Sequence, residues 1–489
     1  MGLRFGPISL RDRGRMWGLP RICCGLRRFS WARRPAMSSV LDQLYASALD
    51  GCRCAFPDGG DVRIARAPGR VNVIGEHTDY NGLPVLPTAI DREIAIAFTV
   101  SESVEVTLTN IDSRFTKKSF VLSDTIEPFD RGDWGNYAKA AGQALWRWAA
   151  ENSPKSLPLK GFRGCAGGTI PPGSGLSSSS AMVVASAFAF IAANDLGIGR
   201  EELAGLLARA ERYVGTEGGG MDQAASILSK PGCVLRIDFR PLKAQPVPLP
   251  DDCMFVIANS MVEANKAGQA RLAYNTRVVE CRLGVRMLKT IARDDYPEVD
   301  SAVLLGDVMR TVPTWRAAID DLPDGALDLA DVAEFCGEKE SEMRENCLKL
   351  RDGSLLDEPA GGFQVKKRCR HVLTEAERVS LAASAMSEGR LADLGCYMND
   401  SHESCASDYE VSCEELDRLV GVLRRNGALG ARLTGAGFGG CAVASVTRQG
   451  AEELLKGAQR DYYGSFNGDI ESVLFECVAS GGAGVIIGR

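Results

Sequence analysis

A glycine- and serine-rich segment that leads into a long apolar stretch restricts the fold of this chain more than any other feature. It reads PPGSGLSSSSA, residues 171–181, and continues as AMVVASAFAFIAANDLG up to Gly197. The apolar stretch predicts a buried helix, and glycines before it allow the backbone to approach a ligand closely. A helix N-terminus favours anions, because it presents unpaired N–H groups and the positive end of the dipole. We therefore expect a phosphate-binding loop; a flexible linker before an N-capped helix is the alternative, which the apolar, proline-stiffened TIPP disfavours.

Two common nucleotide-binding patterns do not describe this chain. There is no GxxxxGK[ST] sequence, so the loop is not that of a P-loop nucleotide enzyme. Gly435, Gly437 and Gly440 satisfy GxGxxG, but that segment leads into CAVASV, which is typical of a strand. A dinucleotide-binding fold needs a helix after these glycines, so we do not expect one.

A second motif, GRVNVIGEHTDY at residues 69–80, crowds polar groups into a short apolar stretch. Arg70, Asn72, Glu76, His77 and Asp79 stand where a buried strand would carry valine and isoleucine. The motif is either an ordinary surface turn or a pocket shaped around a polar ligand. Because it follows the strand-like VRIARA, a solvated turn is disfavoured, and we expect a pocket.

A third motif, TEGGGMDQAAS, places Asp222 after three glycines at the expected start of a helix. Glycines such as Gly219 leave room for a substrate, and the helix dipole would keep the carboxylate ionised, as a proton acceptor must be. Glu211 lies on the helix before it. Taken alone, an N-cap aspartate and a solvated surface acid are the simpler interpretations of these two residues.

The order of predicted elements indicates an α/β protein of two domains, the expected number for 489 residues. Alternating apolar residues predict strands at 61–67, 93–100 and 103–110, with Ser-Glu-Ser at 101–103 as a hairpin turn between the last two. The proline-rich RPLKAQPVPLP, residues 240–250, is the candidate domain boundary. Residues 270–425 are predicted to be mainly helical, and RLTGAGFGGCAVASV after them predicts a strand, a glycine loop and another strand.

Charge and hydropathy exclude several functional classes. Residues 1–37 hold nine arginines and one acid, and the net charge of the whole chain is −6. The residues after 37 therefore carry a formal charge of about −14. A body this acidic is a poor partner for nucleic acid. The longest apolar run, residues 181–193, is shorter than the roughly 20 residues that span a bilayer, so no membrane association is expected. The sixteen cysteines are scattered and favour reduced thiols, and a zinc site is not expected.

The arginine-rich start can be interpreted in more than one way. It resembles an organelle transit peptide, but it could also be an unstructured extension or sequence upstream of a true start at Met37. We expect a disordered extension over residues 1–40 and a cytoplasmic protein.

Together the motifs resemble a known family. GRVNVIGEHTDYNG, PPGSGLSSSSA and LTGAGFGGC look like the three ordered motifs of the GHMP small-molecule kinases, and the first is specific to the galactokinase branch. WGNYAKA, VGTEGGGMDQ, YNTRVVECRL and SHESCASDYEVSCEELD match as well. The eukaryotic subgroup of plant galactokinases and N-acetylgalactosamine kinases is the most similar. The resemblance implies an α/β (α+β) fold with an N-terminal domain at 41–245, a C-terminal domain at 246–489 and the active site between them.

The resemblance also implies roles for individual residues. Asp222 would accept the proton of the anomeric hydroxyl, with Arg70 beside it. The residues implied in sugar binding are Glu76, His77, Asp79, Gly219 and Tyr274. Those implied in ATP binding are Gly173, Ser174, Gly175, Leu176, Ser177, Ser178, Ser179, Trp134, Gly435 and Gly437. Ser178 and Glu211 match magnesium ligands of related kinases. Ser180 stands where the family often has alanine, and we expect this difference to matter little.

The activity implied is ATP-dependent phosphorylation of D-galactose at its anomeric hydroxyl, with Mg²⁺, by a monomer. Tyr274 favours galactose over N-acetylgalactosamine, because the amino-sugar kinases tend to carry phenylalanine at that place. An N-acetylgalactosamine kinase remains one alternative. A non-catalytic galactose sensor on the same fold is another, disfavoured because the serine loop is full length and Asp222 is present.

Overall fold

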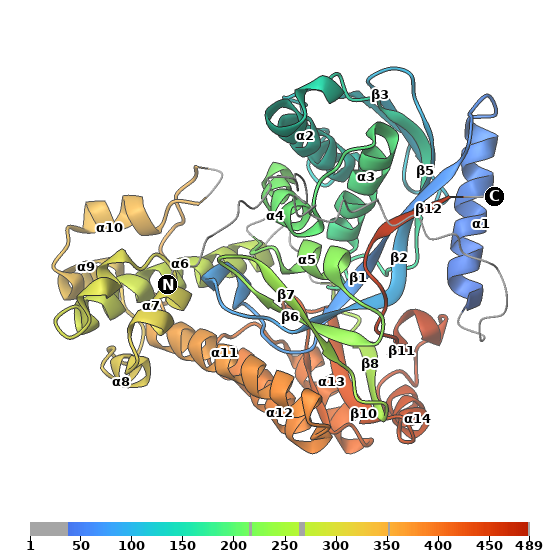
Figure 1. The fold of residues 1–489 in the computed structure, drawn as a ribbon. Helices are drawn as coiled ribbons and strands as arrows, with labels where there is room; N and C mark the ends of the chain where they lie inside the picture. Colours follow the sequence, from blue (N-terminus) through green and yellow to red (C-terminus); the bar gives the residue numbers. More distant parts are fainter. Residues whose placement is uncertain (1–37, 215–217, 264–268, 351–352, 488–489) are drawn as a thin grey trace, which may run out of the picture.

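The computed structural model describes residues 38–214, 218–263, 269–350 and 353–487. The predicted N-terminal extension lies outside the described residues except for positions 38–40, which already belong to the first helix, α1 (Ser38–Ala55). Three β-sheets and helices on their faces make up the rest (Figure 1).

The first sheet carries the polar motif at residues 69–80. Its six strands run in the order β12 (Gly484–Ile487), β1 (Arg63–Asn72), β2 (Pro87–Val100), β5 (Phe162–Gly168), β3 (Glu105–Asn110) and β4 (Lys118–Val121). The alternation predicted for β2 divides its side chains between two cores. Ile96 and Phe98 pack with the helices on one face, whereas Ala95 and Ala97 pack under α1 on the other. Figure 1 shows α1 on the side of this sheet opposite to α2 and α3.

Four helices lie on the side of the first sheet opposite α1, two of them against the strands and the other two packed on those. They are α2 (Gly135–Asn152), α3 (Ser178–Asn194), α4 (Arg200–Ala210) and α5 (Met221–Leu228). The predicted buried helix is α3, and every residue from Ser180 to Ile191 is buried. Its first turn follows the glycine loop at residues 171–177, so the loop is anchored by one of the most buried elements of the chain.

The second sheet lies in the other half of the molecule. Its order is β11 (Leu474–Cys477), β8 (Cys253–Asn259), β10 (Cys441–Thr447) and β9 (Gly430–Leu433), all antiparallel. One of its faces packs against α13 (Glu414–Arg425) and α14 (Ala451–Asp461). The predicted third glycine loop connects β9 to β10, as the sequence pattern indicated.

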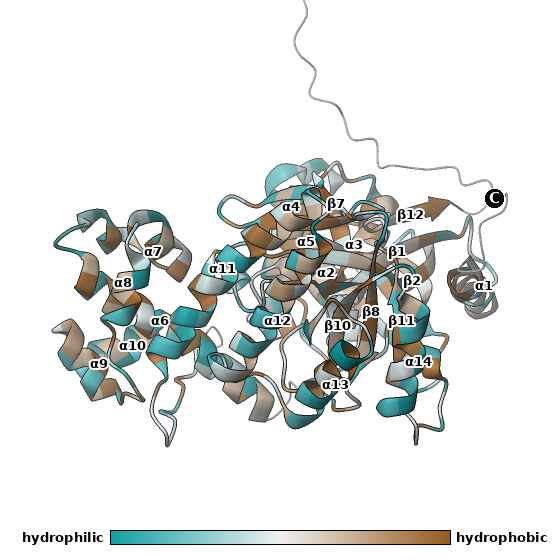
Figure 2. Cartoon of the chain, turned by 90° about the horizontal axis from the view of Figure 1, so that it is seen from below, coloured by the Kyte–Doolittle hydropathy of each residue, from teal (hydrophilic) through white to brown (hydrophobic). Residues whose placement is uncertain are grey.

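A helical group completes this half. Its members are α6 (Gln269–Ala292), α7 (Leu305–Thr311), α8 (Trp315–Asp320), α9 (Leu329–Cys336), α10 (Glu340–Cys347), α11 (Val365–Ser387) and α12 (Leu391–Ser407). α6–α10 and the first half of α11 share a separate hydrophobic core, whereas the second half of α11 and most of α12 pack into the core of the first sheet. Both views place α7–α10 at one end of the molecule, beyond α6 and away from the sheets (Figure 2).

Strand pairing differs from the sequence-based expectation in three places. The Ser-Glu-Ser segment does not close a hairpin, because β5 lies between β2 and β3 and is parallel to β3. The proline-rich segment contains a strand, β7 (Lys243–Pro248), which pairs with β6 (Cys233–Asp238). Its prolines are tolerated because β7 pairs on one side only. The C-terminal β12 returns to pair with β1. Local patterns identify strands, but distant contacts decide which strands pair.

No helix within the described ranges combines the length and the apolar character needed to cross a membrane.

Candidate functional site

Arg70 and Asp222 form an ion pair at the centre of the site. Arg70 lies near the end of β1, and Asp222 is in the first turn of α5, after the left-handed Gly220. The guanidinium Nε donates to Asp222 Oδ1 at 2.8 Å, and a second nitrogen lies 2.7 Å from the same oxygen. Arg70 is almost fully buried, whereas the Asp222 side chain is 22% exposed. The arginine favours the ionised form of Asp222, and the carboxylate remains accessible to a ligand.

Serines of the helix that follows the glycine loop contact the other carboxylate oxygen. The Ser177 hydroxyl donates to Asp222 Oδ2 at 2.5 Å. The Ser180 hydroxyl donates to Glu211 and lies 3.4 Å from Asp222 Oδ2. Ser177 precedes α3 with a left-handed φ of 62°, and Ser180 lies in the first turn of the helix, so both hydroxyls reach the acids from the start of α3. Ser178, the predicted partner of Glu211, begins α3 and lies about 200° round the helix from Ser180.

The glycine loop has a backbone conformation that few sequences allow. Gly173, Gly175 and Ser177 have φ values of 68°, 78° and 62°, in the left-handed region. The Gly175 carbonyl accepts a hydrogen bond of 2.6 Å from Arg70, and the buried Ser174 hydroxyl donates to Pro171 O at 2.6 Å. The loop is therefore held in place beside the Arg70–Asp222 pair.

The third glycine loop, residues 434–440, packs directly on this first loop. A Cβ on Gly435 would lie 2.9 Å from Gly175 O, and one on Gly440 would lie 2.9 Å from Ser174 O. Both glycines also have positive φ. Side chains are thus excluded at these positions for two reasons, steric and conformational. The two predicted ATP-binding loops meet backbone to backbone.

An aromatic cluster surrounds His77. Its ring lies 5.6 Å from Tyr274, 5.9 Å from Tyr80 and 4.7 Å from Tyr409, between centroids. His77 Nδ1 is 3.1 Å from the Tyr80 hydroxyl, which is 2.7 Å from that of Tyr409. The other ring nitrogen, Nε2, is buried and makes no hydrogen bond of normal geometry to a described residue, although the Ala436 backbone lies close to the ring. Burial, together with the nearby His371 and Arg277, lowers the pKa of His77 well below its usual value, so the ring is neutral.

Asp79 is fixed by the glycines that precede Asp222. Gly219 N donates to Asp79 Oδ2 at 3.1 Å, and a Cβ on Gly219 would lie 2.4 Å from Tyr80 N. Burial and the charge of Asp222 raise the pKa of Asp79. The predicted sugar-binding and catalytic motifs are thus in direct contact.

Glu76 is buried in a network that joins the two halves of the molecule. Its carboxylate accepts hydrogen bonds from Asn72 and from Gly435 N, and lies 3.4 Å from Arg432 of β9. Arg432 also donates to Asn72 O and to Ser401. Burial raises the pKa of Glu76, and the Arg432 guanidinium opposes that shift. The network fixes the polar turn against the third loop.

Fewer contacts define the residues predicted to bind the nucleotide base and a metal ion. Trp134 immediately precedes α2, donates to Thr116 O at 3.0 Å and contacts the Phe115 ring. Among the described residues, no group of three His, Cys, Asp or Glu side chains could hold a metal ion. Hydroxyl and carboxylate oxygens at the start of α3 and at Glu211 are donors that suit Mg²⁺ when phosphate oxygens and waters supply the rest.

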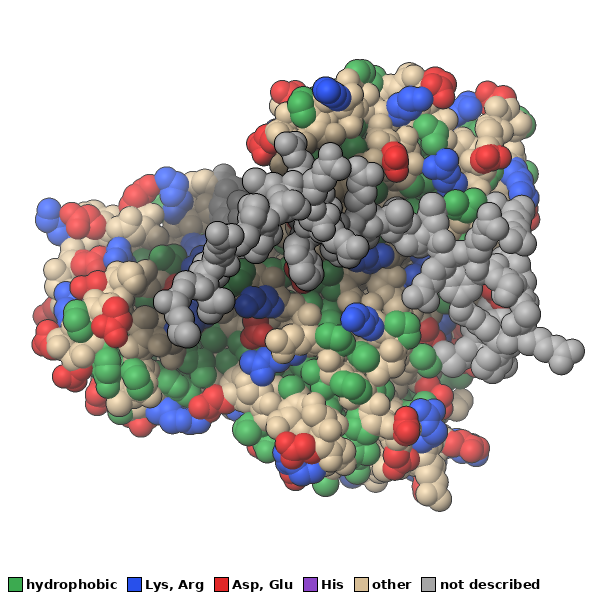
Figure 3. All heavy atoms as spheres, viewed as in Figure 1, with side chains coloured by type: hydrophobic (Ala, Val, Ile, Leu, Met, Phe, Trp, Pro, Cys, Tyr) green, Lys and Arg blue, Asp and Glu red, His purple; other side chains and the backbone are tan. Residues whose placement is uncertain are grey.

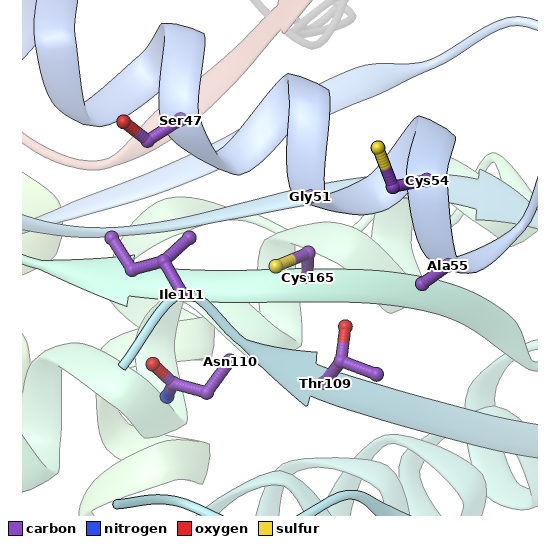
Figure 4. Close-up of a pocket in the computed structure, with 8 residues that line it drawn as sticks. All are labelled: Ser47, Gly51, Cys54, Ala55, Thr109, Asn110, Ile111 and Cys165. Atoms are coloured by element: carbon purple, nitrogen blue, oxygen red, sulfur yellow. The ribbon is translucent and has the colours of Figure 1, made fainter. Parts of the chain in front are cut away.

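Two other surface features lie apart from this site. Acidic and basic side chains are interspersed over the face in Figure 3. A shallow hollow lies between α1 and the strands β3 and β5, with Ser47, Cys54, Asn110 and Cys165 in its walls (Figure 4). It is on the α1 side of the first sheet, opposite to α3.

Comparisons with known proteins agree with this geometry. The galactokinase galactose-binding signature matches residues 55–100, and the N- and C-terminal domain models of the GHMP kinases match 136–230 and 382–464. A galactokinase of Dictyostelium discoideum is 35% identical over 441 residues, 82% of this chain and 84% of the relative. One from Candida albicans is 32% identical over 460 residues, 86% and 89% of the two chains. The chain belongs to the galactokinase family.

A solved structure in this family has the same fold. Lactococcus lactis galactokinase, crystallised in complex with galactose, is 27% identical with a TM-score of 0.69, over 91% of this chain and 99% of that one. The expected family and its α/β GHMP kinase fold are therefore confirmed.

The structure brings most of the predicted site residues together and adds others. Arg70, Asp222, the serine loop and the third glycine loop are joined by the contacts described above. Motif matching did not single out Tyr80, Tyr409 and Arg432, and it gave Ser180 no role. Tyr80 and Tyr409 stand inside quoted motifs, but their pairing joins positions 329 residues apart. No local sequence signal reveals such a contact.

Proposed function

We propose that this chain transfers the γ-phosphoryl group of ATP to the anomeric hydroxyl of D-galactose, giving galactose 1-phosphate. The observation that carries the proposal is the Asp222 carboxylate, held by Arg70 and Ser177 beside the glycine loop. The carboxylate lies beside the loop expected to bind phosphate and contacts the polar turn at residues 69–80 through Arg70. The galactokinase family membership supports the same activity.

In the mechanism, Asp222 accepts or orients the proton of the attacking hydroxyl. Arg70 keeps the carboxylate ionised and offsets negative charge on the transferring group. The left-handed backbone at Gly173–Ser177 and the start of α3 present N–H groups to the phosphates. Mg²⁺, when bound, would neutralise phosphate charge, and we assign its protein ligands to Ser178 and Glu211. Catalysis is then mostly positioning and charge neutralisation.

We assign sugar recognition to His77, Asp79, Glu76, Gly219 and Tyr274. One support comes from His77 Nε2, a buried nitrogen that makes no hydrogen bond of normal geometry in the described structure. Leaving such a group unpaired costs about 1–3 kcal/mol, and a sugar hydroxyl would remove that cost. His77 also has φ 63°, a strained conformation for a histidine that is common at functional sites.

Steady-state rates on galactose and N-acetylgalactosamine test the proposal. We expect kcat/KM to be at least about tenfold higher on galactose, a difference of about 1.4 kcal/mol in transition-state binding. A higher kcat/KM on N-acetylgalactosamine would identify that sugar, and not galactose, as the substrate. Absence of turnover on both sugars, with galactose still bound, would favour a sensor.

We further propose that the protein acts as a monomer in the cytoplasm. Arg70, Asp222 and both glycine loops come from one chain, so a second copy is not needed to complete the site. All the described cysteines are free, as is usual in a reducing compartment. Light scattering and fluorescence microscopy of a tagged full-length chain test the two statements.

A further inference from the structure

Ser180 occupies an unusual position in the first turn of α3. Its side chain is 2% exposed, and its hydroxyl lies within reach of two carboxylates, those of Glu211 and Asp222. Glu211 is itself only 8% exposed. Two carboxylates that approach the same hydroxyl repel each other, and a neutral hydroxyl can lie between them. Ser180 is therefore not a passive helix serine.

The two carboxylate oxygens of Asp222 have different hydrogen-bond partners. Arg70 binds Oδ1, whereas Ser177 donates to Oδ2. A serine hydroxyl has a single proton, and that of Ser180 goes to the closer carboxylate, Glu211. Ser177 therefore donates to Asp222, and Ser180 lies between the two acids and donates to Glu211. Without the Ser180 oxygen, Glu211 would keep its charge but lose one hydrogen bond that holds it beside Asp222.

We propose that Ser180 is a positioning residue for phosphoryl transfer, which holds the Glu211 carboxylate beside Asp222 at the base of the phosphate loop. The proposal rests on the proposed kinase function and adds a residue to which neither the motifs nor the family resemblance gave a role. Because Ser180 contacts Asp222 and Glu211 and none of the residues assigned to the sugar, it acts on the reaction step. Galactose binding is independent of it.

The chain offers a matched control on the same helix. Ser186 is fully buried in α3, and its hydroxyl has no hydrogen-bond partner among the described residues. Ser180→Ala and Ser186→Ala therefore each remove one buried hydroxyl oxygen from the same helix. Only the first change removes a contact with a carboxylate. Alanine is a good helix former, so both variants should fold.

Steady-state kinetics of the two variants test the proposal. For Ser180→Ala we expect kcat to fall about tenfold, since a hydrogen bond to a charged group is lost. The KM for galactose should stay within about twofold. Ser186→Ala should change neither constant by more than about twofold.

A binding measurement provides a readout that does not depend on turnover. Calorimetry of ADP binding with and without Mg²⁺ should show that the affinity gained from Mg²⁺ is several-fold smaller in Ser180→Ala than in Ser186→Ala. Calorimetry of galactose binding should be the same in both.

The outcomes separate this inference from the proposed function. Unchanged kcat in Ser180→Ala, an equal loss in Ser186→Ala, or a loss confined to the galactose KM would each overturn the role of Ser180. A wild-type chain inactive on galactose and on N-acetylgalactosamine would instead refute the proposed function.

Discussion

The sugar-side turn, residues 69–80, and the phosphate loop, residues 171–177, are held by different kinds of contact. Side chains hold the turn: Glu76 is paired with Arg432 and Asn72, and Glu375 accepts a hydrogen bond from Gly75 N at 2.9 Å. The phosphate loop is held mainly through its backbone. Its carbonyls accept from Arg70 and pack against Gly435 and Gly440 of the third loop.

This difference suits the two ligands proposed for these regions. A sugar is recognised by hydroxyls at fixed angles, and recognition improves when buried side chains are locked before it binds. Phosphates are recognised by backbone N–H groups, which need a particular main-chain conformation and little side-chain bulk. We infer that side-chain changes should damage the first region most, and backbone changes the second.

The largest effect is expected at Asp222, where the two regions meet. Asp222→Ala removes the proton acceptor and the partner of Arg70, so kcat should fall on the order of 10³-fold. Galactose affinity, measured by calorimetry, should change by less than about fivefold, because the residues assigned to the sugar remain. Full residual activity would exclude Asp222 as the acceptor and would move the chemistry away from this contact.

The next largest effect concerns the side-chain network of the sugar-side turn. Arg432→Met leaves the buried Glu76 and Glu375 without their shared cation, and should lower the free energy of unfolding by about 3 kcal/mol. Urea denaturation measures the change. Arg316→Met, which removes an exposed ion pair with Glu377, is the control and should leave the midpoint unchanged. Equal midpoints in the two variants would show that the network does not stabilise the turn.

The sequence predicted the site better than it predicted the strand order. Asp222, Arg70 and the two glycine loops stand in short motifs whose composition is costly without a ligand, so each was visible locally. The Arg432–Glu76 pair was not visible in the sequence, because Arg432 stands in a segment that is typical of an ordinary strand. Its complete burial depends on α12 and on the turn at Asn72, 360 residues away. Ser180 was expected to matter little at a helix start, and only the fold places two acids against it.

A pH-dependent loss of stability should come from the buried histidines. All three histidines of the chain, His77, His371 and His402, have pKa values lowered by burial, the latter two to about 4. The unfolded chain takes up protons below about pH 6.5, whereas the folded chain does not. Stability attributable to these groups therefore falls as the pH drops from 7 towards 4, by about 2 kcal/mol in total between pH 7 and 6.

A histidine variant tests this contribution. His402 Nδ1 accepts a hydrogen bond of 3.3 Å from Leu433 N, and its Nε2 lies 3.3 Å from Asp417 Oδ1. This histidine is not among the residues assigned to the sugar. In His402→Gln the loss of unfolding free energy between pH 7 and 6 should be smaller by about 0.7 kcal/mol than in the wild type. Identical pH profiles of the two proteins would contradict a buried neutral imidazole at this position.

A small effect is also expected from a backbone change in the phosphate loop. Gly173 has φ 68° and open space around it, so Gly173→Ala should cost only about 1 kcal/mol of stability through strain. Gly325→Ala is a matched control, because Gly325 has φ 87° with nothing near its Cβ and lies between α8 and α9. We expect equal stability losses but a several-fold higher KM for ATP in Gly173→Ala alone, with the galactose KM unchanged. Equal ATP KM values would mean that the backbone of this loop does not hold the nucleotide, and the contrast with the sugar-side turn would then fail on the phosphate side.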